Sequence, residues 1–360
     1  MTMQNNFFKF YIVFYMTVGQ VHAAPLDALL TANPLSHKAE VFVEASFDSM
    51  NETLDVLKIR AKDPQYAETN VGDYSGAHVR AGYGLTDDLS VHAGYWKRKI
   101  FYRQDQESIV SWQTAAQYRF HGDANSQENY AIRFGTWGNL AKVLDKTSPT
   151  NISRYTVGSM SIKDLLDFQV QIDAVGTWKL GEQVELSAFS GMGHSWVETG
   201  NIVANYTDQS GCDYKITFTQ TGASGILVSP CLSPVVITGF TTDNTLVQSF
   251  SYGSNYYQVG GMLNWKVDNF IVRGGYQFQH LVRQNVDSLI AGGGGISYKN
   301  NHIFVMDVSY KLSPKTSVFA RTQVMSNQFV GEIPFTYNHL TSSKFSKRYG
   351  YVSVGGRYTF

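Results

Sequence analysis

The sequence predicts an all-β fold, a closed antiparallel transmembrane β-barrel of about 12 strands. Three observations support this prediction: many segments alternate between apolar and polar residues, the connections between them alternate between short and long, and charged residues make up only 16% of the chain. Alternation with period two is typical of strands that bury one face. Short turns at one end and long loops at the other are typical of membrane barrels. Soluble domains carry about 25% charged residues, so an apolar exterior suits this composition better.

The N-terminal 23 residues have the features of a secretory signal peptide. Lys9 precedes the apolar run 10–18, and Val21 and Ala23 form the small-x-small pattern of a cleavage site. The apolar run is too short for a spanning helix, and no longer one follows, which excludes a helical membrane protein. We expect residues 1–23 to be removed, residues 24–37 to form a short leader and residues 38–360 to form one barrel domain.

The predicted strands follow one another along the chain, and each is long enough to cross a membrane at a tilt, which needs about 9–11 residues. Their ranges are 39–50, 73–85, 89–103, 108–120, 128–138, 168–180, 184–197, 255–267, 270–283, 302–312, 316–326 and 348–360. Short polar turns are predicted at 86–88, 121–127, 181–183, 267–269 and 313–315. Long connections are predicted at 51–72, 139–166, 198–254, 284–301 and 326–347, with one tight exception at 104–107.

Aromatic residues recur at the outward strand positions next to the short turns. These residues are Tyr83, Tyr118, Phe120, Tyr130, Trp178, Trp265, Phe270, Tyr310, Tyr358 and Phe360. Strands are enriched in aromatic residues in general, but that preference does not explain why they gather at one end of strand after strand. We interpret them as a girdle at one membrane interface, where rings with an apolar body and a polar tip are stable.

Charged and polar residues occupy the opposite, inward positions. The residues that we expect to line the lumen are Glu44, Asp48, His78, Arg80, His92, Arg98, Arg133, Asp173, Glu185, Arg273, Asp307, Arg321 and Arg357. Basic residues exceed acidic ones, which favours a wet conduit for anionic or polar solutes. The alternative is a narrow barrel filled by ion pairs. Barrels of eight strands are filled by side chains and those of sixteen are open, so the strand number leaves both interpretations in place.

The connection 198–254 is the longest and contains both cysteines of the chain, Cys212 and Cys231. In an exported chain we expect them to form one disulfide, which would hold an outer hairpin made from the β-rich pieces 215–219 and 235–240. Two further barrel strands, giving 14, are the alternative. Pro230 and Pro234 argue against it, because proline breaks the ladder of a central strand.

Other classes of function find little support. The net charge is zero, so the chain has no electrostatic basis for binding nucleic acid. The alternative from the enzyme class is an outer-membrane hydrolase of the lipase or protease type, which needs a nucleophile and a base within hydrogen-bond reach. His194 and Ser195 are consecutive and face opposite sides of a strand. We expect no catalytic motif, no metal site and no cofactor, and a closed structural or surface-interaction barrel is the remaining alternative.

The last eight residues form a strand with one apolar face and end on Phe360. This segment resembles the C-terminal signal of bacterial outer-membrane β-barrel proteins, polar-x-Gly-x-x-aromatic-x-aromatic, and Ser353, Gly355, Tyr358 and Phe360 occupy its four fixed places. The resemblance selects no family within that class. It implies recognition by the β-barrel assembly machinery, insertion into outer-membrane lipid of a Gram-negative bacterium and a last strand that pairs with the first. With an even number of strands, both termini are expected to be periplasmic.

Together these features predict a passive outer-membrane channel for small polar or anionic solutes. No plug domain is expected before the barrel, because the leader 24–37 is too short for one.

Deletion of Phe360 is expected to impair assembly, because it removes the terminal aromatic residue of the predicted signal. The measurement is the amount of folded protein in the outer membrane, compared with the full chain. A truncated chain that reaches the outer membrane at normal levels would show that this interpretation of the last residue is wrong.

Overall fold

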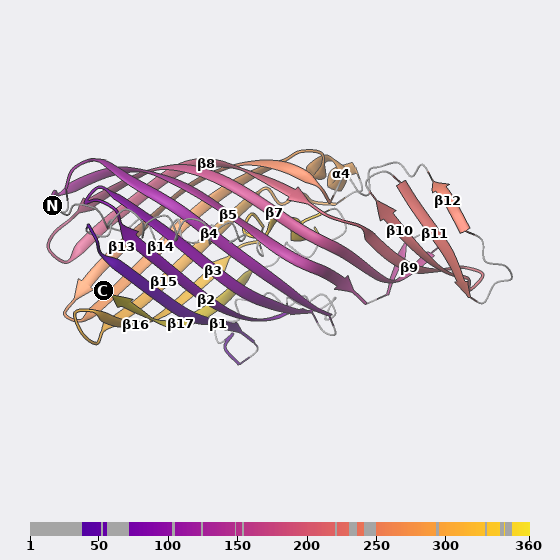
Figure 1. Cartoon of the computed structure of the whole chain (residues 1–360), viewed down its shortest axis with the longest axis horizontal. Coiled ribbons are helices and arrows are strands. Elements are labelled where there is room, and N and C mark those ends of the chain that lie inside the picture. The colour runs from indigo at the N-terminus through magenta and orange to yellow at the C-terminus, as the bar shows by residue number, and fades with distance from the viewer. Residues whose placement is uncertain are drawn as a thin grey trace, which may run out of the picture.

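The protein's structure, a computed structural model, is a closed barrel of 12 antiparallel strands (Figure 1). It describes residues 38–51, 53–55, 72–102, 105–123, 125–147, 149–152, 155–219, 222–229, 236–240, 250–292, 295–327, 330–338, 342 and 348–360. The signal peptide and leader expected in residues 1–37 lie outside these ranges. The wall strands are β1 (Val41–Met50), β2 (Asp73–Gly84), β3 (Leu89–Tyr102), β4 (Asp105–His121), β5 (Glu128–Lys146), β7 (Tyr155–Lys179), β8 (Val184–Glu198), β13 (Tyr252–Val267), β14 (Phe270–Arg283), β15 (Asn300–Lys311), β16 (Thr316–Met325) and β17 (Tyr349–Thr359).

The first strand closes the barrel against the last. β1 pairs with β2 on one side and with β17 on the other, where the register runs from Phe42 opposite Thr359 to Ser49 opposite Val352. No strand edge is left along this seam, so the backbone groups of β1 and β17 are paired within the wall. The closed antiparallel barrel and its 12 strands are confirmed, and the alternative of 14 strands is wrong.

The connections differ between the two ends of the barrel. At the end where the Phe360 amide donates to the Val41 carbonyl, called the turn end, connections of two to six residues join the strands. The opposite end, called the loop end, carries the long connections 51–72, 199–251, 284–299 and 326–348. Two of these contain the helix α4 (Val286–Gly292) and the 3-10 turn η2 (Pro334–Thr336). In the described part of the chain, no helix is long and apolar enough to cross a membrane.

The two faces of the wall separate as the alternation predicts. In β1, Phe47 on the exterior is 72% exposed, whereas its neighbours Ser46 and Asp48 on the interior are each 3% exposed. The same apolar exterior continues around the wall through Val79, Tyr95, Ile132, Phe134, Ile172, Met192, Val259, Leu263, Phe304, Met306 and Val354. A continuous apolar band of this extent is stable in hydrocarbon rather than in water. The barrel is therefore a transmembrane barrel.

The predicted girdle residues lie on the exterior beside the short turns. Tyr83, Tyr118, Trp265, Phe270 and Tyr310 are exposed, and Trp178 is half-buried. Several of them contact a second ring on the neighbouring strand, as Phe270 and Tyr310 do at 4.8 Å between centroids. These contacts form a belt of rings around the turn end of the apolar band.

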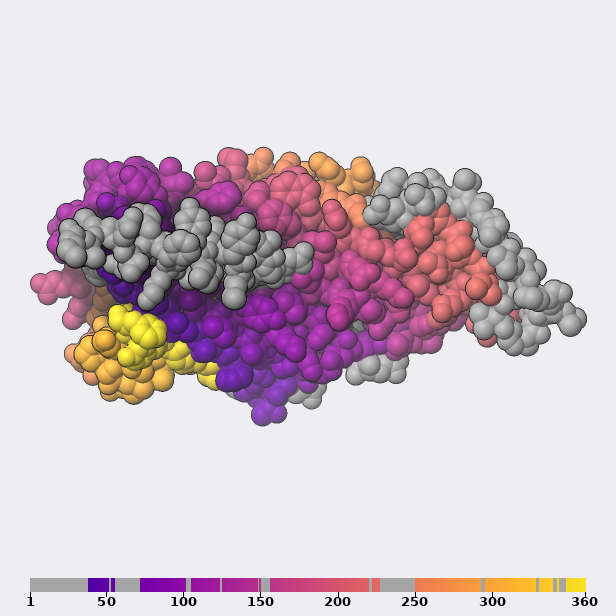
Figure 2. All heavy atoms as spheres, viewed as in Figure 1, coloured from indigo at the N-terminus to yellow at the C-terminus, as the bar shows by residue number. Residues whose placement is uncertain are grey.

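Beyond the loop end, the sheet of the wall continues on one side into an extension that projects from the barrel, which we call the projecting sheet (Figures 1 and 2). β5 and β7 extend into it, and its other strands are β6 (Thr150–Ile152), β9 (Ile202–Asp208), β10 (Asp213–Thr219), β11 (Gly222–Ser229) and β12 (Val236–Phe240). β9 pairs with β7, and β10, β11 and β12 follow in order. The prediction that 139–166 is a connection is wrong, because most of it continues β5 and β7. The predicted outer hairpin in 198–254 is instead a sheet of four strands.

Asp208 organises the turn between β9 and β10. Its carboxylate accepts hydrogen bonds from the amides of Cys212 and Ser210 and from the Tyr214 hydroxyl. These hydrogen bonds lower the pKa of the Asp208 carboxyl, and the bond from the Cys212 amide has the largest effect. Cys212 is buried beside this turn, whereas Cys231 lies outside the described residues, so the pairing of Cys212 with Cys231 stays a prediction.

The closure can be tested by a cysteine pair across the seam. Phe47 and Val354 face each other on the exterior of β1 and β17, and directly opposed residues have Cα atoms about 4.5–5.5 Å apart, which a disulfide can bridge. In a background without the native cysteines, we expect Phe47→Cys with Val354→Cys to oxidise and change the mobility of the denatured chain. The control pairs Phe47→Cys with Tyr358→Cys, about 14 Å away. Equal cross-linking of both pairs would contradict the register.

Candidate functional site: the barrel lumen

All thirteen predicted lumen residues lie on the inner face of the wall. Seven of them line a cavity at the turn end: Glu44, Arg80, His92, Glu185, Arg273, Arg321 and Arg357. The other six are buried and do not line this cavity: Asp48, His78, Arg98, Arg133, Asp173 and Asp307. The lumen is thus divided along its length into a cavity, a layer of ion pairs and a filled outer part.

A chain of ion pairs crosses several strands at the inner end of the cavity. Glu44 on β1 pairs with Arg80 on β2 at 2.9 Å and with Arg321 on β16 at 3.3 Å. Asp307 on β15 pairs with Arg321 at 3.1 Å and with Arg273 on β14 at 3.4 Å. Both carboxylates are buried. Burying a charge is unfavourable unless it is paired, so these side chains stabilise one another in a single arrangement.

The ion pair between Glu44 and Arg321 spans β17, which lies between their strands. Gly355 is the inward residue of β17 at this level, and a Cβ atom there would lie 2.6 Å from the Phe319 ring and 2.3 Å from the Ala45 carbonyl oxygen. A side chain at position 355 would therefore collide with the packed wall. The glycine of the predicted C-terminal signal thus has a packing role in the closed seam.

A second polar cluster surrounds Asp173 on β7. Its carboxylate accepts hydrogen bonds from Arg133 at 2.8 Å, Gln171 at 2.6 Å and Gln258 at 2.8 Å. Gln258 lies on β13, on the far side of β8, and a Cβ atom at Gly191 of β8 would lie 1.9 Å from Asp173 Oδ1. A glycine again allows side chains of separated strands to meet inside the barrel.

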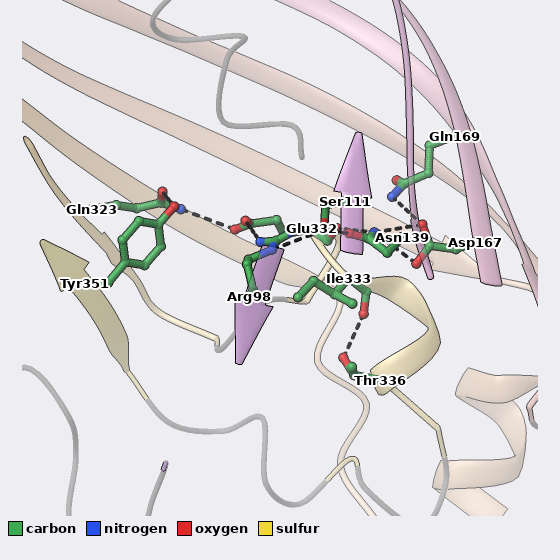
Figure 3. Close-up of polar contacts among 10 residues, drawn as sticks. All are labelled: Arg98, Ser111, Asn139, Asp167, Gln169, Gln323, Glu332, Ile333, Thr336 and Tyr351. Atoms are coloured by element: carbon green, nitrogen blue, oxygen red, sulfur yellow. Dashed lines mark hydrogen bonds and ion pairs between the residues drawn. The ribbon is translucent and has the colours of Figure 1, made fainter. Parts of the chain in front are cut away.

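The connection between β16 and β17 folds into the outer part of the lumen. The segment Val330–Asn338 is buried throughout, and we call it the inner loop. Glu332 lies at its centre and pairs with Arg98 of β3 at 2.6 Å (Figure 3). Asn139 of β5 donates to the backbone carbonyl of Glu332 at 2.9 Å and to Asp167 at 2.8 Å. One loop carboxylate therefore completes a polar network made by several wall strands.

Further contacts hold the inner loop by its backbone. The Tyr252 hydroxyl donates to the carbonyl oxygens of Pro334 at 2.7 Å and Tyr337 at 3.0 Å. The Arg283 guanidinium lies 3.9 Å from the centroid of the Tyr337 ring, a cation–π contact. The apolar side chains of the loop join the same buried cluster as wall residues such as Ile109 and Leu165, and several of these side chains are fully buried. The loop therefore fills the lumen at this level.

A cavity of about 520 Å³ lies at the turn end. Nine basic residues line it: Arg80, Arg119, Lys179, Lys266, Arg273, Lys311, Lys315, Arg321 and Arg357. Three acidic residues line it: Glu40, Glu44 and Glu185. The cavity wall therefore carries a clear excess of positive charge, although the whole chain has a net charge of zero. A confined space lined by one sign of charge concentrates the field that acts on a solute.

Several buried polar atoms of the inner wall have no hydrogen-bond partner among the residues that the structure describes. Both polar atoms of the Gln279 amide are among them, as are the side-chain oxygens of Gln117, Gln169, Gln277 and Asn264. Buried polar groups without a partner are unfavourable in a dry interior. These residues suit a lumen in which water or a polar solute supplies the missing hydrogen bonds.

Three histidines of the wall, His78, His92 and His194, lie in different surroundings. His78 stacks on Trp96 at 3.7 Å between ring centroids, and His92 contacts Ser90 and the Phe42 ring. Ser195 is buried inside the wall, whereas His194 is on the exterior and bonds Asn255. The described residues contain no group of three or more His, Cys, Asp or Glu that could hold a metal ion.

The inner loop is the functional feature that the sequence analysis missed, because residues 326–347 were predicted to be an outer loop. One signal was available. Val330, Ile333, Phe335 and Tyr337 place four large apolar or aromatic residues around a single acidic one. A loop exposed to water gains little from such side chains, so this composition favours burial.

The contacts of Glu332 can be tested through the accessibility of the inner loop. We introduce Thr336→Cys as a reporter, since Thr336 is buried, and measure its reaction with a water-soluble maleimide in the folded barrel. Glu332→Gln leaves the Arg98 guanidinium buried without its carboxylate, which costs at least about 1.5 kcal/mol even where the intact pair adds little, so labelling is expected to accelerate at least about tenfold. Glu185→Gln, which changes another buried carboxylate away from the loop, is the control. Equal rates in all three backgrounds would contradict the role of Glu332.

No protein-family model matches the chain, and no curated protein matches it. Among solved structures, the translocator domain of the autotransporter NalP from Neisseria meningitidis is 9% identical, with a TM-score of 0.47 and 93% of each chain covered. The NanC porin is 9% identical, with a TM-score of 0.39, over 88% of this chain and 98% of NanC. The toluene transporter TodX of P. putida is 8% identical, with a TM-score of 0.35, over 92% and 91%. These structures are bacterial outer-membrane β-barrels.

Proposed function

We propose that this protein is a channel of the Gram-negative outer membrane for small polar or anionic solutes, and that its described conformation is a closed state. In this proposal the turn end faces the periplasm and the projecting sheet faces outward. The signal-like segment Ser353–Phe360 and the girdle at the turn end support this orientation. No catalytic role is assigned to the barrel.

The observation that carries the proposal is the polar character of the lumen from the cavity to the inner loop. A barrel that serves only as a scaffold gains most from an interior of packed apolar side chains. This interior instead presents charged residues, amides and the orphaned polar atoms of Gln279. Such a wall becomes favourable when water and solutes reach it, which is the condition of a conducting channel.

The inner loop is the proposed gate. It occupies the lumen between the projecting sheet and the layer of ion pairs, so a solute passes only when the loop moves. Its polar anchors are the Glu332 carboxylate and the carbonyl oxygens of Glu332, Pro334 and Tyr337. Water can replace each of these partners, because all are ordinary hydrogen-bonding groups. The loop can therefore leave without exposing unsatisfied polar groups.

Planar-bilayer conductance of the refolded protein tests the channel and its gate together. We compare the full chain, Glu332→Gln and a variant in which residues 327–347 are replaced by a short Gly/Ser turn. We expect brief or rare openings in the full chain, a higher open probability for Glu332→Gln and a persistent, larger conductance without the loop, because removal of the loop leaves a water-filled lumen.

The control for this experiment is Lys215→Ala in the projecting sheet, which should behave like the full chain. Mobility of unheated samples on gels confirms that each variant is a folded barrel. If the folded variant without residues 327–347 is as ion-tight as the full chain, the channel proposal fails, and a closed structural barrel becomes the better interpretation.

A further inference from the structure

Four arginines lie near two carboxylates at the inner end of the turn-end cavity, and three of them pair with these carboxylates. Arg80, Arg273, Arg321 and Arg357 all line the cavity, and we call them the arginine ring. Glu44 pairs with Arg80 and Arg321, and Asp307 pairs with Arg321 and Arg273. Arg321 is thus bound to both carboxylates, and the ring carries two more positive charges than these carboxylates neutralise.

Arg357 is the member of the arginine ring whose positive charge is least compensated by carboxylates. Among the described residues, no carboxylate lies within ion-pair distance of its guanidinium. The guanidinium instead lies 3.9 Å from the centroid of the Phe42 ring, and the Arg80 guanidinium lies 5.4 Å from the same centroid. Phe42 therefore holds two cations beside each other at the cavity wall, an arrangement that an anion between them would stabilise.

The rest of the cavity wall does not remove this excess. Arg119 pairs with Asp88, but Lys266, Lys311 and Lys315 add further positive charge, with Glu40 and Glu185 opposing them. The excess of basic residues therefore continues from the arginine ring toward the turn end. An anion that enters from this end meets an attractive field along its path.

We propose that the arginine ring is a binding site for small oxyanions, meaning solutes with carboxylate, phosphate or sulfate groups. The planar guanidinium group donates paired hydrogen bonds that match the oxygens of these groups. A cavity of about 520 Å³ admits a small organic anion. The inference rests on the proposed function, for which it names the substrate class, and it assigns to Arg357 the uncompensated charge that selects an anion.

The test measures binding without a membrane, so that it is independent of conduction. The full chain is refolded in detergent micelles and titrated calorimetrically with citrate and with inorganic pyrophosphate, at ionic strengths of about 0.01 M and about 1 M. We expect saturable binding at low salt that is strongly weakened at high salt. Absence of saturable binding by the folded full chain at low salt would overturn the proposal.

Arg357→Gln is the decisive variant, and its affinity is expected to fall at least about tenfold, since a charged hydrogen bond is lost. Lys215→Gln removes the same charge in the projecting sheet and should bind like the full chain. Because Arg357 lies in the strand that closes the barrel, a second variant, Lys266→Gln with Lys311→Gln, weakens the cavity field if Arg357→Gln does not fold. Unchanged affinity in the folded cavity variants, or an equal loss in Lys215→Gln, would overturn the site.

The outcomes separate the site from the channel. A barrel that binds these anions but stays ion-tight after replacement of residues 327–347 would support the anion site and contradict the channel proposal. A barrel that conducts but shows no saturable anion binding would contradict the anion site and support the channel proposal.

Discussion

The hydrogen-bonded seam between β1 and β17 is the constraint on which the rest of the structure depends. In hydrocarbon, every backbone amide and carbonyl must be paired within the protein, and the register from Phe42–Thr359 to Ser49–Val352 achieves this for the two strands that would otherwise be edges. Closure then fixes the inner position of every second residue. Because a wall of 12 strands encloses more space than eight strands do, closure also creates the problem of what occupies the lumen.

Three solutions to that problem are combined along the barrel axis. Near the middle, side chains of separated strands meet directly, and glycines such as Gly191 and Gly355 leave the intervening strand flat enough for them to do so. In the outer part, the inner loop replaces side chains with a piece of backbone whose carbonyl oxygens Asn139 and Tyr252 satisfy. At the turn end the lumen stays open as the basic cavity. Only the first solution uses the wall strands alone.

This division explains how much the sequence predicted. Strand bounds, faces and closure were predictable because membrane and lumen impose opposite polarity on alternate residues, as in Ser46, Phe47 and Asp48. Outside the membrane that contrast disappears. Lys142 and Lys163 are exposed on β5 and β7, where water tolerates charge, so the extended parts of these strands were predicted to be a loop. The position of Glu332 depends on Arg98, 234 residues away, and no local pattern reports a contact of that range.

A buried ion pair, and not apolar packing alone, holds the inner loop in place. Two charges that leave water lose about as much solvation energy as their attraction returns, so the closed pair of Arg98 and Glu332 and its open, hydrated form are close in free energy. Apolar contacts, in contrast, always favour the closed state. The polar anchors therefore give the loop a defined position without adding greatly to the free energy of closure. A fixed but weakly favoured position is what a reversible gate requires, because the closed and open states must differ by only a few kcal/mol.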